Sequence, residues 1–184
     1  MRLLLSLVLY AVVMSSPALV AAAPASSNNL RPQDDRLTQL LRAGSARSAT
    51  FKSLVDRIEA SHVIVYVAIN PLMKPNLSGM LTWMTKAGGY RYVRASISND
   101  LTPDQMIATI AHELQHAVEV IEDETVGDEK SLVALYRRIG QQSGTASPSR
   151  WETEAAQRTG FVVRRELASA PVTTIARAGD AARW

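Results

Sequence analysis

TPDQMIATIAHELQHAVEVIE, residues 102–122, predicts an amphipathic helix. The other predicted elements are placed relative to this helix. Thr102 is a favourable N-cap, Pro103 suits the first helical position, and Gln105 completes a capping box with Thr102. On a helical wheel, the apolar side chains gather away from His112; they are Ile107, Ile110, Leu114, Ala117, Val118 and Ile121. We therefore expect one face of this helix to pack on the core and the face of His112 to line a cleft.

The same stretch contains the motif H-E-x-x-H, formed by His112, Glu113 and His116. Residues four apart on a helix lie about 40° apart around the axis and roughly 6 Å apart along it, so two imidazoles can converge on one metal ion. Zinc accepts imidazole nitrogen at about 2.0–2.1 Å in a tetrahedral site. We predict that His112 and His116 are zinc ligands; the alternative is two exposed histidines beside an incidental glutamate.

Glu113 has a different predicted role from the histidines on either side of it. It lies about 100° from His112 around the helix, so its side chain should reach the water that the metal activates rather than the metal itself. A carboxylate there can accept a proton from this water and later deliver it to a leaving amine. Glu113 is therefore the predicted catalytic base.

A catalytic zinc site needs a third protein ligand and an open fourth position. With no cysteine and only three histidines, this ligand must be His62 or a carboxylate. Glu152 is the preferred candidate, because on a helix predicted from about Arg150 to Ala168 it shares a face with small side chains that allow close helix packing. A capping box between Ser149 and Glu152 is the structural alternative.

Three further residues remain candidates for the third ligand. Glu154 is four residues before Arg158 and is expected to form a solvated ion pair with it. Glu119 lies a full turn beyond His116, so a role behind the ligands suits it better than ligation. His62 opens a stretch that predicts a buried strand, where an ordinary hydrogen-bonded histidine is expected.

The segments on either side of the motif helix predict a mixed α+β fold. Those upstream are a helix from Asp34 or Asp35 to a stop at Gly44, a helix at Ala49–Ala60, a strand at His62–Ile69, and hairpin arms at Met80–Lys86 and Tyr90–Ser98 joined by Gly88-Gly89. An acidic loop, a helix through Leu132 and Ile139 that stops at Gly140, and a loop at Gln141–Pro148 are expected downstream. Helices, a small sheet and then more helices favour a single α+β domain, in which the sheet packs on the motif helix.

The first 25 residues match a secretory signal peptide. Arg2 is the basic start, Leu3–Met14 is apolar, and Ala23-Pro24-Ala25 fits the cleavage pattern. The predicted mature domain is 26–184, which starts with a flexible arm at Ser26–Pro32 and is secreted or periplasmic, with no membrane attachment after cleavage. An uncleaved anchor is the alternative, although the apolar stretch is short for a span of about 20 residues.

The charge of the chain argues against one class of partner. A net charge of +3 and a pI of about 9.4 suit an anionic partner, but the sequence has no run of Lys and Arg and no basic patch interleaved with aromatic residues. We expect no nucleic-acid binding.

The motif resembles that of the zincin metallopeptidases, and in particular of the gluzincins, which bind zinc through two motif histidines and a distant helical glutamate. It does not match the longer metzincin pattern, because Glu119 and Glu122 stand where that pattern has Gly and His. The chain is also similar to short exported bacterial proteins with His-Glu-Leu-Gln-His followed by a Glu-Thr element. The resemblance implies a zincin-like fold in which Met80–Lys86 is an edge strand that aligns extended peptide substrate.

Zincins also stabilise an oxyanion, and this chain has no histidine downstream of its motif to do so. Tyr136, Arg137 and Arg138 are the candidates for that role. A propeptide at Ser26–Ala43 that covers the site is a further alternative.

The sequence therefore predicts an exported zinc hydrolase that acts on a peptide or protein, with His112, His116 and Glu152 as ligands and Glu113 as base. Two other interpretations stay open at this point. One is a non-catalytic zinc-bound module that holds a peptide or partner, for which a closed site with Glu119 or His62 as fourth ligand would argue. The other is a metallohydrolase of cell-wall or ester bonds.

Overall fold

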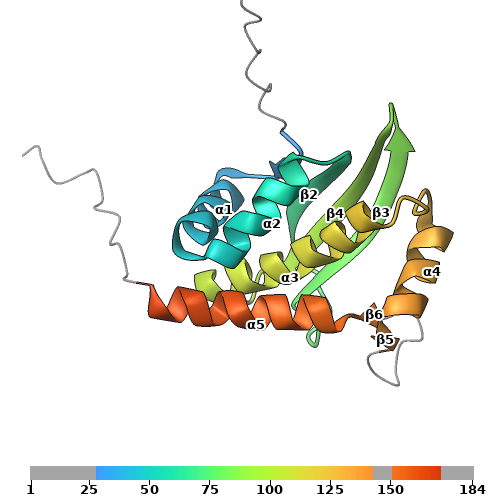
Figure 1. The fold of residues 1–184 in the computed structure, drawn as a ribbon. Coiled ribbons are helices and arrows are strands. Elements are labelled where there is room, and N and C mark those ends of the chain that lie inside the picture. Colours follow the sequence, from blue (N-terminus) through green and yellow to red (C-terminus); the bar gives the residue numbers. More distant parts are fainter. Residues whose placement is uncertain (1–27, 143–150, 171–184) are drawn as a thin grey trace, which may run out of the picture.

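A four-stranded mixed sheet carries a layer of helices on one side in the computed structural model, which describes residues 28–142 and 151–170 (Figure 1). The strands of this sheet are β1 (Leu30–Pro32), β2 (Val63–Asn70), β3 (Gly79–Ala87) and β4 (Tyr90–Ser98). Their order is β1-β2-β4-β3, and β2 runs parallel to both of its neighbours. The predicted hairpin is confirmed as β3 and β4, which are antiparallel, so β3 is an edge strand.

Alternation of side chains along the strands gives the sheet one covered and one open face. Val63, Val65 and Val67 of β2 are fully buried, whereas Tyr66 and Ala68, which point to the other side, are partly exposed. The helices pack on the valine side. No helix of the described residues covers the opposite face of the sheet (Figure 1).

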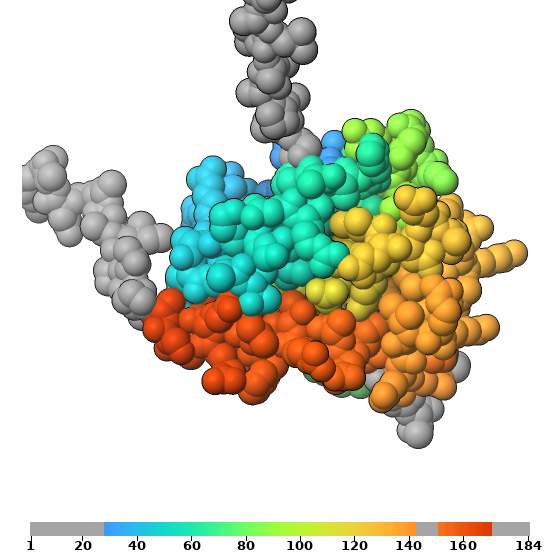
Figure 2. Space-filling view, viewed as in Figure 1, coloured from blue at the N-terminus to red at the C-terminus, as the bar shows by residue number. Residues whose placement is uncertain are grey.

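The helical layer is centred on the motif helix. Its members are α1 (Asp35–Arg47), α2 (Ala49–Glu59), α3 (Pro103–Glu122), α4 (Glu129–Ile139) and α5 (Glu154–Ser169). The capping box of Thr102 and Gln105 is present as predicted. α3 packs against the sheet, α2 and α5, and most of its side chains are buried. In the space-filling view, α5 forms a continuous ridge beside α1 and α2 (Figure 2).

Two expectations for the N-terminal part are wrong. Gly44 does not end α1, which continues to Arg47; a Cβ on Gly44 would lie 2.9 Å from Ile107 Cγ2, so this glycine allows α1 to approach α3 closely. The expected arm at Ser26–Pro32 contains β1, where Leu30 is buried. The idea of a propeptide at Ser26–Ala43 fails for the same reason, because β1 and the buried Leu37 and Leu40 of α1 belong to the core.

The segment before α5 also differs from the prediction. Glu152 is not helical: Trp151–Glu152 form β6, which pairs with β5 (Gln141–Gln142). α5 is capped by Thr153, whose side chain accepts a hydrogen bond from the Ala156 amide. The expected capping box would need Ser149, which lies outside the described residues, as does the signal peptide at residues 1–25.

The α+β class is confirmed, with one connected hydrophobic core formed by the sheet and the helices. Among the described residues, no helix is both long enough and apolar enough to cross a membrane.

Candidate metal centre

α3 presents the motif side chains to a small polar site at its middle. Ile110, Leu114 and Ala117 are fully buried in the core. The opposite side of the same helix carries His112 and His116, whose ring centroids are 4.9 Å apart with an interplanar angle of 79°. The predicted division of this helix into a core face and a motif face is therefore observed.

Glu152 reaches this site from a different part of the chain. It is the last residue of β6, and only Thr153 separates it from α5, which runs alongside α3. Gly140 lets this segment lie close to the end of α4, since a Cβ there would be 3.1 Å from the Glu152 carbonyl oxygen. Glu152 therefore reaches the histidines from β6, and not from a helical face that it shares with small residues.

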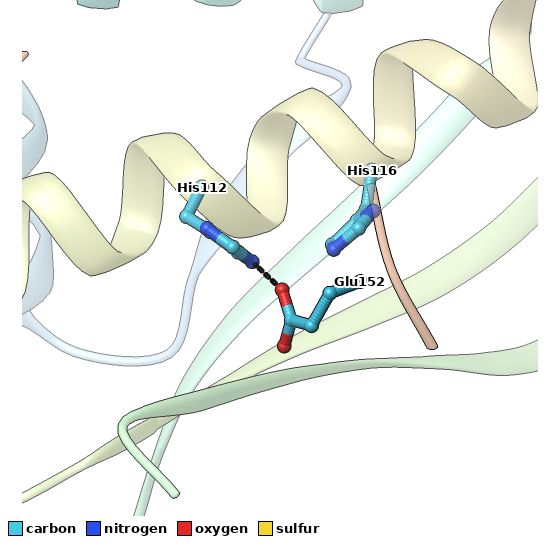
Figure 3. A group of neighbouring side chains, drawn as sticks. All are labelled: His112, His116 and Glu152. Carbon is cyan, nitrogen blue, oxygen red and sulfur yellow. Dashed lines mark ion pairs between the residues drawn. The ribbon is translucent and has the colours of Figure 1, made fainter. Parts of the chain in front are cut away.

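The side chains of His112, His116 and Glu152 point toward one another (Figure 3). Their ligand atoms all lie within 4.8 Å of one another, and His112 Nε2 is 2.9 Å from Glu152 Oε2. Two ligand atoms at 2.0–2.1 Å from a tetrahedral zinc ion are about 3.3 Å apart. The three residues therefore fit a zinc ion with small adjustments of their side chains, and they leave a fourth position open.

The charge of the site also suits a dication. Glu113 and Glu119 are 4% and 5% exposed, and the Glu152 side chain is 18% exposed, so three carboxylates share a largely buried space with two histidines. Burying carboxylates without compensating positive charge is costly. A divalent ion at the centre of His112, His116 and Glu152 would supply that charge.

These carboxylates shift the pKa of His112. Burial alone would lower the pKa of this imidazole, but the hydrogen bond to Glu152 and the charges of Glu113, Glu152 and Glu119 outweigh burial, and the pKa of His112 is raised. The field of the same carboxylates adds to burial in raising the pKa of Tyr136 well above its ordinary value. The site thus attracts a cation, either a proton or a metal ion.

A buried carboxylate fixes the second histidine. His116 Nδ1 is 2.8 Å from Glu119 Oε2. Because this contact engages Nδ1, Nε2 is the ring nitrogen that could bind a metal ion. Glu119 Oε1 accepts a hydrogen bond of 2.5 Å from Thr153 Oγ1, next in the chain to Glu152. Histidine ligands of metals typically donate their other ring nitrogen to a carboxylate in this way. Glu119 lies behind His116 and outside the ligand cluster, as the sequence suggested.

Glu113 lies against the first residue of the edge strand. A Cβ on Gly79 would be 2.5 Å from Glu113 Oε1 and 2.7 Å from Thr109 Cγ2, so only glycine leaves room for this carboxylate. Glu113 does not belong to the ligand cluster. It faces the cleft beside His112.

The cleft has a volume of about 340 Å³ and is open to solvent. One wall is the segment that leads into β3 and the other is α5, where Phe161 is 60% exposed and Arg164 is also exposed. Its lining includes Asn76, Ser78, Gly79, Thr109, His112, Glu113, Glu152, Gln157, Gly160, Phe161 and Arg164. Gly160 lies where α5 packs on α3, and a Cβ there would be 3.5 Å from His112 Cβ, an ordinary contact distance.

The other candidate residues lie away from the cluster. Glu154 forms the expected ion pair with Arg158 on the surface. His62 is exposed just before β2, with its ring 5.5 Å from that of Tyr90, so the expectation of a buried histidine is wrong. His62 is not among the residues that could share a metal ion with His112 and His116.

Of the three residues considered for oxyanion stabilisation, only Tyr136 is near the histidines. It is buried, its ring lies edge-on to His116 at 5.1 Å, and its hydroxyl donates a bond of 3.3 Å to the His116 carbonyl. Arg137 and Arg138 are exposed, and Arg138 pairs with Asp123. Tyr136 therefore supports the histidine from behind in this structure.

Sequence reasoning missed Thr153 and Gly79. Thr153 has a detectable signal, since threonine before a helical stretch is a common N-cap, but a helix that begins near Arg150 would place Thr153 inside it. Gly79 had none, because its role depends on a contact between a strand and a helix that are distant in sequence.

No protein-family model, curated protein or solved structure matches the chain.

Proposed function

We propose that this chain is an exported, zincin-like zinc hydrolase of the gluzincin type that cleaves peptide bonds. The observation that carries the proposal is the convergence of His112, His116 and Glu152, with Glu113 beside them but outside the cluster. A purely structural site needs no such carboxylate. The export part of the proposal rests on the sequence of residues 1–25.

The residues of the site divide the work of hydrolysis among them. His112, His116 and Glu152 would hold the metal, and zinc bound there would supply Lewis-acid activation of water and of the scissile carbonyl. Glu113 would take the proton that water loses as its oxygen adds to the carbonyl carbon. When the C–N bond breaks, Glu113 would return this proton to the leaving amine, so that the protons balance.

A peptide is the substrate class that the surroundings of the site support best. β3 is the edge strand of the sheet, and one of its two sides pairs with β4. No strand of the described residues pairs with its other side, so a strand of substrate could add there. Its first residue contacts Glu113, and Asn76 and Ser78 line the cleft just before it. The part of the edge nearest the site is thus 76–79, upstream of the expected Met80–Lys86.

Metal content tests the ligand assignment. The mature chain should contain about one zinc ion, and the His112→Ala/His116→Ala double variant should lose it. Elemental analysis of both purified proteins decides this, with His62→Ala as the matched control because His62 lies outside the cluster. A stoichiometric metal content in the double variant would disprove the assignment.

Two glutamate variants separate the ligand from the base. Glu113→Gln should keep zinc and lose peptide hydrolysis by about 100-fold or more, the usual scale of general-base loss. Glu152→Gln should weaken zinc binding, with activity partly restored by added zinc. Because Thr153 caps α5, the helix itself should be unaffected. Competition with a zinc chelator and cleavage of a peptide library provide the two measurements.

The alternative of a non-catalytic zinc module makes a different prediction. In that case wild-type protein binds zinc, no peptide of the library is cut, and Glu113→Gln changes nothing. A closed four-ligand site is not favoured by the geometry, because both oxygens of Glu119 already engage His116 and Thr153. Hydrolysis of cell-wall or ester bonds would be found with the corresponding substrates and would leave the roles of the residues unchanged.

A further inference from the structure

The open face of the sheet carries a second hollow, on the opposite side from the metal centre. Its volume is about 720 Å³, and it is lined by residues of β1, β2 and β4 and of the segment that follows β1. None of its lining residues belongs to the cleft of the metal centre. The proposed hydrolase does not use it.

The register of the strands explains the shape of this hollow. Tyr66 pairs with Arg31 on one side and with Arg94 on the other, so these three long side chains form a row across β1, β2 and β4. The next row on the same face contains Ala68 and Ser96, which pair with each other. Side chains that are two residues apart on a strand share a face. The small side chains of Ala68 and Ser96 therefore form the floor of the hollow, and the three long side chains form one of its walls.

The charge of the hollow is entirely positive. Its lining includes Arg31 and Arg94 and no aspartate or glutamate. Their α-carbons are separated by two strand spacings, roughly 10 Å, so both guanidinium groups can reach one ligand above Tyr66 and the floor. Such a pair of cations attracts an anion rather than an apolar partner.

Arg31 is held in place and Arg94 is available. Arg31 donates to the Asn28 carbonyl at 2.9 Å and to the Tyr66 hydroxyl at 3.0 Å, and its guanidinium lies 5.6 Å from the centre of the Tyr66 ring. Arg94 is exposed, and no acidic side chain of the described residues forms an ion pair with it. A site with one oriented guanidinium and one uncommitted guanidinium is arranged for an oxyanion.

We propose that the hollow between Arg31, Tyr66 and Arg94 on the open face of the sheet binds a small phosphorylated anion. A phosphate group carries close to two negative charges at pH 7 and three acceptor oxygens, which match two guanidinium forks. Ser96 and Asn70 add neutral polar groups to the lining. The volume is much larger than one phosphate group, which favours a phosphomonoester over the free ion.

Titration of the mature chain with glycerol 3-phosphate, inorganic phosphate and malonate tests the proposal. In ¹H–¹⁵N spectra, glycerol 3-phosphate should cause saturable shifts of the Tyr66, Ala68 and Ser96 amides. Inorganic phosphate should bind the same residues more weakly. Malonate has the charge of a phosphomonoester without its tetrahedral oxygens, and it should bind at least tenfold more weakly.

The Arg94→Gln variant should weaken binding of glycerol 3-phosphate by tenfold or more. Arg42→Gln is the matched control, because it removes one exposed positive charge from α1 and should change the affinity by less than twofold. The metal ligands are intact in both variants, so phosphate bound to metal would persist in each. No saturable shift with wild type, equal binding of malonate, or an unchanged affinity in a folded Arg94→Gln variant would each overturn the proposal.

Discussion

At the scale of single residues, Thr153 connects the two parts of the chain that form the candidate metal centre. Its hydroxyl accepts the Ala156 amide as the cap of α5 and donates to Glu119, which in turn orients His116. Glu152 is its immediate neighbour, so Thr153 connects the start of α5, the carboxylate behind His116 and the proposed third ligand. Ligands so connected need little reorganisation to hold a metal ion.

Peptide hydrolysis should require a glycine at position 79, because Gly79 lies against the proposed base Glu113. In Gly79→Ala the new methyl group would displace the flexible end of Glu113, which it would otherwise meet at 2.5 Å. Displacement of a catalytic group by about 1 Å can cost up to roughly 100-fold in rate. We expect zinc content to stay normal and peptide hydrolysis to fall at least tenfold, measured on the same preparation.

Gly127→Ala is the matched control for this prediction. The nearest atom to a Cβ at Gly127 is Lys86 Nζ at 3.9 Å, an ordinary contact distance, so hydrolysis should be unchanged. Equal activity of Gly79→Ala and wild type would contradict the placement of Glu113 against the edge strand.

At the scale of elements, Glu166 of α5 ties the end of that helix to the start of α2. Its carboxylate accepts from the Ser48 hydroxyl and from the Thr50 hydroxyl and amide. Burial would raise the pKa of Glu166, but these hydrogen bonds outweigh it and the pKa is lowered. The charged form is therefore favoured by folding.

The resulting pH dependence has a definite sign. A lowered pKa in the folded state stabilises the protein above the unfolded value near 4.5, and this contribution is lost as the pH falls through the folded value. Glu166→Gln should therefore lower the free energy of unfolding by about 1 kcal/mol at pH 7, the scale of a hydrogen-bonded and partly exposed group. The difference should shrink below pH 4.5 in urea denaturation curves.

Glu124→Gln serves as the control for the loss of one negative charge. Glu124 is exposed in the loop after α3, and the difference in stability between Glu124→Gln and wild type should be small and nearly the same at pH 7 and pH 4. A difference between Glu166→Gln and wild type that does not vary with pH would argue against the charged form of Glu166 as the stabilising one.

The elements that the sequence predicts well are those with several local signals. α3 has a cap, a proline at its start and a continuous apolar face, and the hairpin has two glycines, which adopt φ of 58° and 81°. β1 has only three residues and includes Pro32, so it is defined by its pairing with β2 rather than by a pattern of its own. Gly44 is typical of a helix end, but it lies inside α1, where the absence of a Cβ lets α1 approach Ile107 closely.

The candidate site is predictable to the extent that its residues are close in sequence. His112, Glu113 and His116 follow from helical geometry alone. The sequence places Glu152 on a helical face that it does not occupy, because α5 is capped by Thr153 and begins only at Glu154. The hydroxyl of Thr153 also donates to Glu119, which is 34 residues away, and the local sequence pattern contains no sign of this contact.

At the scale of the whole molecule, the candidate centre lies where the long helix of the core meets the C-terminal helix. α3 packs on the sheet with one face and on α5 with another, so its two histidines belong to the helix with the most buried residues in the described part of the chain. Glu152 reaches this pair from β6. Metal binding would therefore couple the C-terminal part of the fold to its core.

This coupling predicts that zinc stabilises the protein as a whole. A ligand that binds only the folded state raises the free energy of unfolding by about 2.7 kcal/mol at a free concentration of 100 times its Kd. For a chain of this size, 1 kcal/mol corresponds to about 2–4 °C in melting temperature. Zinc at that excess should thus raise the Tm of the protein from which a chelator has removed metal by roughly 5–10 °C in thermal scans.

His116→Ala should show no such rise, and His62→Ala should behave as wild type. A zinc-independent Tm in wild type would mean that His112, His116 and Glu152 do not bind zinc together in the folded state, because a site built from two distant parts of the chain exists only after folding.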